Sequence, residues 1–237
     1  MEKLKQSPWE ILKTVQIKPI EQESLDRVFD YLIKQDPTKP DKKQNMIGPG
    51  DLTKVLTFLG CKPLRSEVNL IIWEVDDDLD GYVSKEEYQT MYKRCISDVT
   101  GLEPRKLYNL VQFLMYDKTF RGRVTVEETL QILFVRHGRE NLDGEITAIF
   151  GDEEKNKDGS EKEITYGEYV SKINKRALAE QQEKVKARRK GQVTMPDQDD
   201  DWSKFIIHNY ITQCLYYFIA ANKKNLPAFI VGVLGFW

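Results

Sequence analysis

The stretch from Val75 to Tyr88, VDDDLDGYVSKEEY, decides the fold, because its acidic residues and its glycine fall at fixed intervals. A solvated loop would tolerate this much negative charge but would not order it. Counted from Asp76, the spacing matches a loop of about twelve residues that holds Ca²⁺ between two helices. The residues at its ligand positions are, in chain order, Asp76, Asp78, Asp80, Tyr82, Ser84 and Glu87.

Each of these positions has a chemical role. Ca²⁺ is a hard cation that takes about six to eight oxygen ligands, so oxygens must converge from alternate positions of a tight turn. The three aspartates supply carboxylates, Tyr82 its backbone carbonyl, Ser84 a contact through water, and Glu87 both carboxylate oxygens. Gly81 allows the positive φ of the turn, which a side chain would oppose. The sequence therefore predicts one calcium site in this loop.

An apolar residue at the eighth position of the loop, Val83, is expected to form a short β-bridge with a sister loop. Residues that align with it recur at intervals of about 40 residues, at Ile47, Val124 and Ile164. We therefore predict an all-α fold of four helix-loop-helix units arranged in two pairs.

The other three loops depart from the ligand pattern. In the first, Pro40, Lys42 and Gln44 occupy positions 1, 3 and 5, and in the third Arg121 stands where an aspartate belongs. The fourth, between Asp152 and Glu168, has an insertion with several lysines, although Asp152, Asn156 and Asp158 could still collect around a metal. These units are expected to serve mainly as structural partners.

The helices of the units carry apolar residues at helical spacing. In the second pair, the residues expected to be buried are Leu107, Leu110, Val111, Leu114, Leu130, Leu133 and Phe134. In the first pair, the residues that could line a groove uncovered by calcium, or form a permanent core, are Val55, Leu59, Leu70, Ile71, Met91 and Tyr92.

Composition narrows the function. The net charge is −2, with 36 basic and 38 acidic residues, so nothing favours nucleic acid as a partner. The three cysteines are far apart and the N-terminus has no apolar secretory core, which favours a cytoplasmic or cytoskeletal location. The two histidines, His137 and His208, lack the spacing of a nucleophilic or zinc site, so we expect a non-enzyme.

Three extensions flank the paired units, giving segments 1–20, 21–97, 98–178, 179–201 and 202–237. Trp9 in the first could anchor a partner or pack on the chain itself. The basic end of the fourth unit's exit helix could meet an acidic tubulin surface or remain solvated. The apolar segment 202–237 is too interrupted for the roughly 20 residues of a membrane span, which disfavours a membrane tether relative to burial against a partner.

The chain resembles the calmodulin and troponin C superfamily of EF-hand proteins over residues 21–178, most closely in LTKVLTFLGCKPLRSEVNLIIWEVDDDLDGYVSKEEYQTMY. The resemblance implies two lobes and helical protein partners. In combining one complete loop with altered loops and long extensions, the chain is also similar to EF-hand subunits of ciliary axonemes, such as that of the outer dynein arm docking complex. This resemblance implies a calcium-binding subunit of a microtubule-associated assembly. A calcium-insensitive structural adaptor is the alternative, and a membrane-tethered EF-hand protein a further one.

Overall fold

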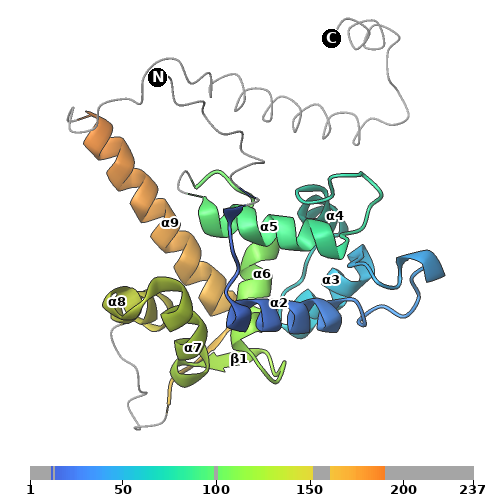
Figure 1. Cartoon of the computed structure of the whole chain (residues 1–237), viewed down its shortest axis with the longest axis horizontal. Helices are drawn as coiled ribbons and strands as arrows, with labels where there is room; N and C mark the ends of the chain where they lie inside the picture. The colour runs from blue at the N-terminus through green and yellow to red at the C-terminus, as the bar shows by residue number, and fades with distance from the viewer. Residues whose placement is uncertain (1–11, 13, 99–100, 152–160, 190–237) are drawn as a thin grey trace, which may run out of the picture. The chain divides into compact units, whose positions relative to one another are not determined.

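The computed structural model describes residues 12, 14–98, 101–151 and 161–189. Within them the fold is all-α, with a single short two-stranded sheet (Figure 1). Among these residues no helix is long and apolar enough to cross a membrane. The predictions for Trp9, for Asp152, Asn156 and Asp158, and for segment 202–237 fall outside the described residues.

The first pair of units contains four α-helices. They are α2 (Pro19–Leu32), α3 (Pro49–Phe58), α4 (Arg65–Trp73) and α5 (Lys85–Ser97), with a 3₁₀ turn at Asp41–Lys43. Proline at the first turn of α2 and α3 suits a position whose N–H has no partner within the helix. The backbone N–H groups of Ile47 and Val83 each donate to the other residue's carbonyl at 2.9 Å, which confirms the predicted bridge.

The second pair repeats this arrangement with a longer bridge. Its elements are α6 (Lys106–Tyr116), β1 (Arg123–Thr125), α7 (Val126–His137), α8 (Arg139–Phe150), β2 (Glu163–Thr165) and α9 (Tyr166–Arg189). The two strands are antiparallel, with Val124 opposite Ile164. The spacing of apolar bridge residues thus predicted both loop pairings.

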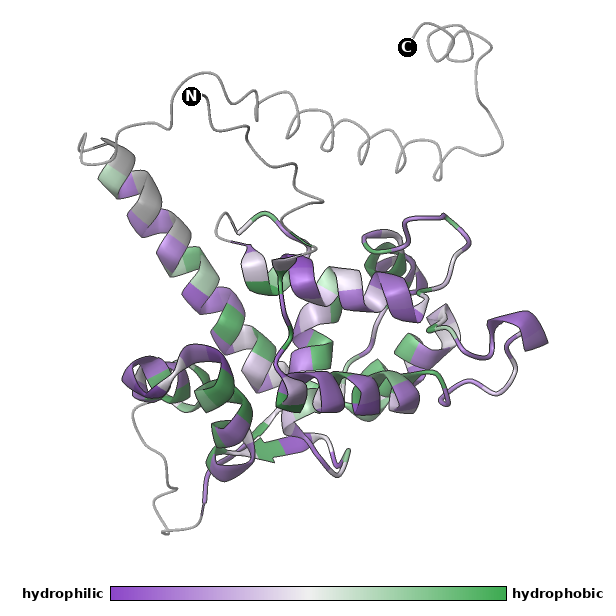
Figure 2. Cartoon of the chain, viewed as in Figure 1, coloured by the Kyte–Doolittle hydropathy of each residue, from purple (hydrophilic) through white to green (hydrophobic). Residues whose placement is uncertain are grey.

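Helix α6 joins the two pairs into one core. All residues from Leu107 to Tyr116 are buried, and the helix contacts α2, α4, α5 and α7. The described residues up to Gln181 accordingly form one compact unit. Figure 2 shows apolar and hydrophilic residues interleaved along the helices, as expected for helices with one buried face.

A buried polar cluster also links the pairs. The Arg136 guanidinium on α7 donates to Glu21 Oε1 on α2 at 2.7 and 2.9 Å, and to Tyr108 Oη and Gln112 Oε1 on α6 at 2.6 and 2.7 Å. It also donates to the hydroxyl of Tyr92 on α5. Glu21 is the counterion of this guanidinium, because an unpaired charge at this depth would be strongly destabilising.

Most of the burial predictions hold, but that for Phe134 is wrong and Leu130 is only half-buried. Of the residues expected in the core of the second pair, Phe134 is 52% exposed, whereas its neighbour Leu133 is 1% exposed. Leu133 lies on the inner face of α7, and one residue further the helix turns the ring of Phe134 outward. In the first pair Leu70 is half-buried, and the other five candidate groove residues are buried, as a permanent core requires.

Candidate metal site

The loop between α4 and α5 brings three predicted ligands together. Asp76, Asp78 and Asp80 each offer a carboxylate oxygen, and these atoms lie within 4.8 Å of one another. Helix α4 ends at Trp73 and α5 begins at Lys85, so both ends of the loop are anchored in helices whose apolar faces are buried. The loop can therefore present a concentrated group of hard oxygen ligands, the type that Ca²⁺ prefers.

The backbone of the loop wraps around its own carboxylates. Gly81 has φ +82°, as predicted, and its N–H donates to Asp76 Oδ2 at 2.8 Å. The N–H of Asp80 donates to Asp76 Oδ1 at 3.1 Å, and the N–H of Tyr82 donates to Asp80 Oδ1 at 2.9 Å. An ionised carboxylate has about four acceptor positions, so these bonds leave capacity for a cation.

Glu87 ties the two ends of the loop to α5. Its Oε2 accepts the N–H and the hydroxyl of Ser84, both at 2.8 Å, and its Oε1 accepts the N–H of Asp77 at 2.8 Å. Ser84 in turn caps the helix, because its Oγ accepts the N–H of Glu87. The carboxylate predicted to complete the metal site thus already spans the loop from its start to its end.

The ionised form of the Asp76 carboxyl is disfavoured, mainly by burial. Burial raises the pKa of its carboxyl above the ordinary value, and the hydrogen bond with Asp78 and the charge of Glu87 act in the same direction. The N–H groups of Gly81 and Asp80 oppose this rise without cancelling it. A bound cation would offset this cost, and the three converging carboxylates are hard oxygen donors of the kind that Ca²⁺ takes.

A lysine of the first loop reaches into this site. Lys43, at the end of the 3₁₀ turn, forms an ion pair with Asp80 Oδ2, and its ammonium lies 5.2 Å from the centre of the Tyr82 ring. Both charged side chains are about a quarter exposed. Lys43 neutralises one ligand carboxylate and stands where it would compete with a metal.

The third loop places a guanidinium on its own twelfth-position carboxylate. Arg121 donates to both oxygens of Glu128 at 3.0 Å and to Glu163 Oε1 at 2.9 Å. Asp117, at the first position, accepts the N–H groups of Arg121 and Gly122. The loop keeps its bent shape with an arginine as the counterion, in line with the expectation that it has a structural role.

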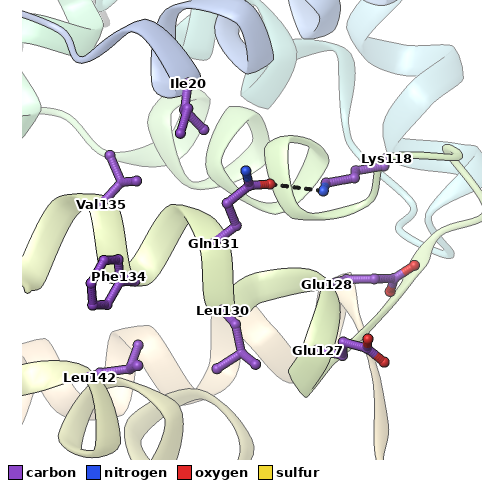
Figure 3. A pocket seen from close by; sticks show the side chains of 9 residues that line it. All are labelled: Ile20, Lys118, Glu127, Glu128, Leu130, Gln131, Phe134, Val135 and Leu142. Atoms are coloured by element: carbon purple, nitrogen blue, oxygen red, sulfur yellow. Dashed lines mark hydrogen bonds between the residues drawn. The ribbon is translucent and has the colours of Figure 1, made fainter. Parts of the chain in front are cut away.

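An open pocket lies on the second pair, where α2 begins. Its volume is about 750 Å³, and its lining residues are Ile20, Lys118, Glu127, Glu128, Leu130, Gln131, Phe134, Val135 and Leu142. Figure 3 shows Phe134 between Val135 and Leu142, with Lys118 and the two glutamates toward one end. Lys118 donates to Gln131 Oε1 at 3.1 Å. The pocket is therefore lined mainly by apolar side chains, with charged side chains at one end.

The comparisons with known proteins agree with this architecture. The profile of the EF-hand domain pair matches residues 43–95. A protein of Arabidopsis thaliana described as a probable calcium-binding protein, CML27, is 30% identical over 111 residues, which are 47% of this chain and 56% of that protein. The chain thus spans little more than half the length of this relative.

Proposed function

The chain belongs to the EF-hand superfamily, and from this premise we propose that it is a calcium-binding regulatory or adaptor subunit with one metal site. The observation that carries the proposal is the convergence of the carboxylates of Asp76, Asp78 and Asp80 between two helices. Ca²⁺ would be held by these three side chains, the Tyr82 carbonyl and Glu87, with Ser84 in contact through water.

Glu87 is the residue through which binding would reach the rest of the protein. Its side chain contacts both ends of the loop and its backbone lies in the first turn of α5. Further along the same helix, Tyr92 takes part in the buried cluster around Arg136. A change in the contacts of Glu87 therefore has a continuous packed route from the loop to the contact between the two pairs.

The partner we propose is a helical segment of a larger protein assembly. Support comes from the apolar pocket beside Phe134, whose exposed ring has no role in the core. The sequence resemblance alone carries the further proposals that this assembly is a ciliary axoneme and that the protein is cytoplasmic or cytoskeletal. Co-sedimentation of the full chain with axonemes stripped of their dynein arms, compared with undecorated microtubules, tests this assignment.

A structural adaptor that ignores calcium is the second candidate, and one observation favours it. The first, second and third loops each carry a cationic side chain on a ligand-position carboxylate: Lys39 on Asp51, Lys43 on Asp80 and Arg121 on Glu128. Such contacts can hold loops closed without metal. The second loop differs in having three further carboxylates beside its lysine-bound one, Asp76, Asp78 and Glu87.

Hydrogen exchange of the full chain separates the two candidates. With calcium at a saturating level, a regulatory subunit gains protection at the amides of the loop and the first turn of α5, especially Gly81 and Tyr82. An adaptor shows the same exchange with calcium and with chelator. Identical exchange under both conditions would overturn the regulatory proposal.

A further inference from the structure

A buried ammonium group lies inside the first loop, between α2 and α3. The side chain of Lys39 is 3% exposed, and its Nζ donates to the carbonyls of Ile33 at 2.7 Å and Met46 at 2.8 Å, with Gln44 O at 3.5 Å. The carboxylate of Asp51, fully buried, lies 2.7 Å from the same nitrogen. The ammonium is thus surrounded by oxygen ligands only.

The bridge between Ile47 and Val83 sets the register between this loop and the calcium loop. In that register Met46 corresponds to Tyr82 and Asp51 to Glu87. The hydrogen bonds repeat as well: Asp51 Oδ2 accepts Gly48 N at 2.8 Å and Oδ1 accepts Asp36 N at 2.7 Å. Glu87 makes the same two kinds of contact, with Ser84 N and Asp77 N. Two partners of the Lys39 ammonium, the Met46 carbonyl and the Asp51 carboxylate, therefore correspond to the seventh-position carbonyl and the twelfth-position carboxylate of the calcium loop.

We infer that the first loop is a cation site filled by the chain's own Lys39 ammonium. A buried lysine needs a counter-charge and an acceptor for each of its three N–H donors. Here carbonyls from both halves of the loop converge on a compact charge that has three donors. One carboxylate balances one positive charge, so the site suits a primary ammonium ion, whereas Ca²⁺ sites usually contain several carboxylates.

The neighbouring residues keep the lysine in place. The side-chain amide of Gln44 donates to the Lys39 carbonyl at 2.6 Å, which closes the loop around the lysine. At Gly50 an added Cβ would lie 1.8 Å from Asp36 Oδ2, so a side chain there would displace the Asp36 carboxylate from its present position. The residue that fills the site lies just before Pro40, outside the twelve-residue frame in which the sequence places Lys42.

The inference goes beyond the proposed calcium function, because it concerns a loop that needs no metal. A first loop closed by Lys39 keeps Ile47 in position at any calcium concentration. Because Ile47 pairs with Val83, the calcium loop then has a partner whose position does not change with calcium.

Chemical rescue of the vacated site tests the inference. The background is the full chain with Glu87→Gln, which removes the twelfth-position carboxylate of the calcium loop, so the outcome is independent of calcium binding there. Adding Lys39→Ala should lower the midpoint of thermal unfolding. Methylammonium chloride should then raise the midpoint saturably, and more than tetramethylammonium chloride of equal ionic strength, which has no N–H donors. The Glu87→Gln chain alone should respond equally to both salts.

Equal responses of the doubly substituted chain to the two salts would overturn the inference, as would an unchanged midpoint. If the doubly substituted chain does not fold, a second experiment tests the inference. The lysines of the unaltered chain are labelled with an acetylating reagent in the presence of chelator. Lys39 should remain protected while the exposed Lys42 reacts. Reaction of Lys39 at the rate of Lys42 would contradict a metal-independent, filled site.

Discussion

Arg136 on α7 donates two hydrogen bonds to a single oxygen of Glu21 on α2, at 2.7 and 2.9 Å, and both side chains are largely buried. The two residues belong to different pairs of helix-loop-helix units, and the tyrosines of α5 and α6 complete the cluster. The contact between the pairs is therefore specified by a charged network inside an apolar boundary. The two pairs thus share one core, which differs from the two lobes that the family resemblance implies.

Removal of one member of this ion pair should destabilise the whole unit. Arg136→Met leaves the Glu21 carboxylate buried without its counterion, which costs about 3–5 kcal/mol of unfolding free energy. The combination of Arg136→Met with Glu21→Gln should recover much of that loss, because no buried charge remains. Urea unfolding of the two single variants and the double variant measures the coupling. A loss below about 1 kcal/mol for Arg136→Met would contradict the role given to the pair.

Lys43 should weaken calcium binding. Its ammonium neutralises Asp80 and must leave that carboxylate before a metal can use it. Lys43→Met is therefore expected to tighten calcium binding by a few-fold, with a smaller gain at high salt, because screening already weakens the competing ion pair. Lys42→Met, at an exposed position next to it, is the matched control and should have little effect. Weaker binding in Lys43→Met would show that the lysine supports the site.

Because Phe134 is exposed and Leu133 is buried, substitutions of these two neighbours should affect stability differently. Leu133→Ala should cost about 2–5 kcal/mol of unfolding free energy, as is typical for a buried leucine. Phe134→Ala should change it by no more than about 0.5 kcal/mol, because a largely exposed side chain contributes little to the core. Denaturant unfolding compares the two. Similar losses would place Phe134 in the core after all.

His137 should make stability depend on pH. Burial lowers the pKa of its imidazole below the ordinary value of 6.5, and the charges of Arg136 and Arg176 lower it further, although Glu145 acts in the opposite direction. The unfolded chain then binds a proton at a higher pH than the folded chain, so stability falls as the pH drops through about 6.5. His137→Gln should flatten this part of the pH profile. A profile that stays the same in the variant would contradict the assignment.

The sequence could predict those features that depend on local spacing. The apolar bridge residues Ile47, Val83, Val124 and Ile164 follow a repeat, and each pairs as expected. The three clustered aspartates and the positive φ of Gly81 follow from the loop pattern in the same way. These residues could be predicted from local spacing because each helix-loop-helix unit is formed by one continuous stretch of the chain.

The remaining features depend on contacts that no local pattern encodes. Lys39 was missed because the first loop is longer than twelve residues, so the lysine that fills it falls outside the expected frame. One signal in the sequence could have identified it. The first loop has no acidic residue at positions 1, 3 and 5 but keeps an aspartate at position 12, and a lysine directly precedes it. Lys43 reaches a different loop, and Arg136 meets partners on three other helices. Such long-range contacts depend on how the pairs pack.

Calorimetric titration of the full chain with calcium, at cellular magnesium and alongside Glu87→Gln, tests the central claim most directly. One calcium ion per chain should bind with a dissociation constant of about 10⁻⁷ to 10⁻⁵ M, the range of EF-hand sensors. The heat should vanish in Glu87→Gln, because that substitution removes the carboxylate that closes the loop. No binding by the unaltered chain, or binding that survives Glu87→Gln, would contradict a single calcium site at Asp76–Glu87.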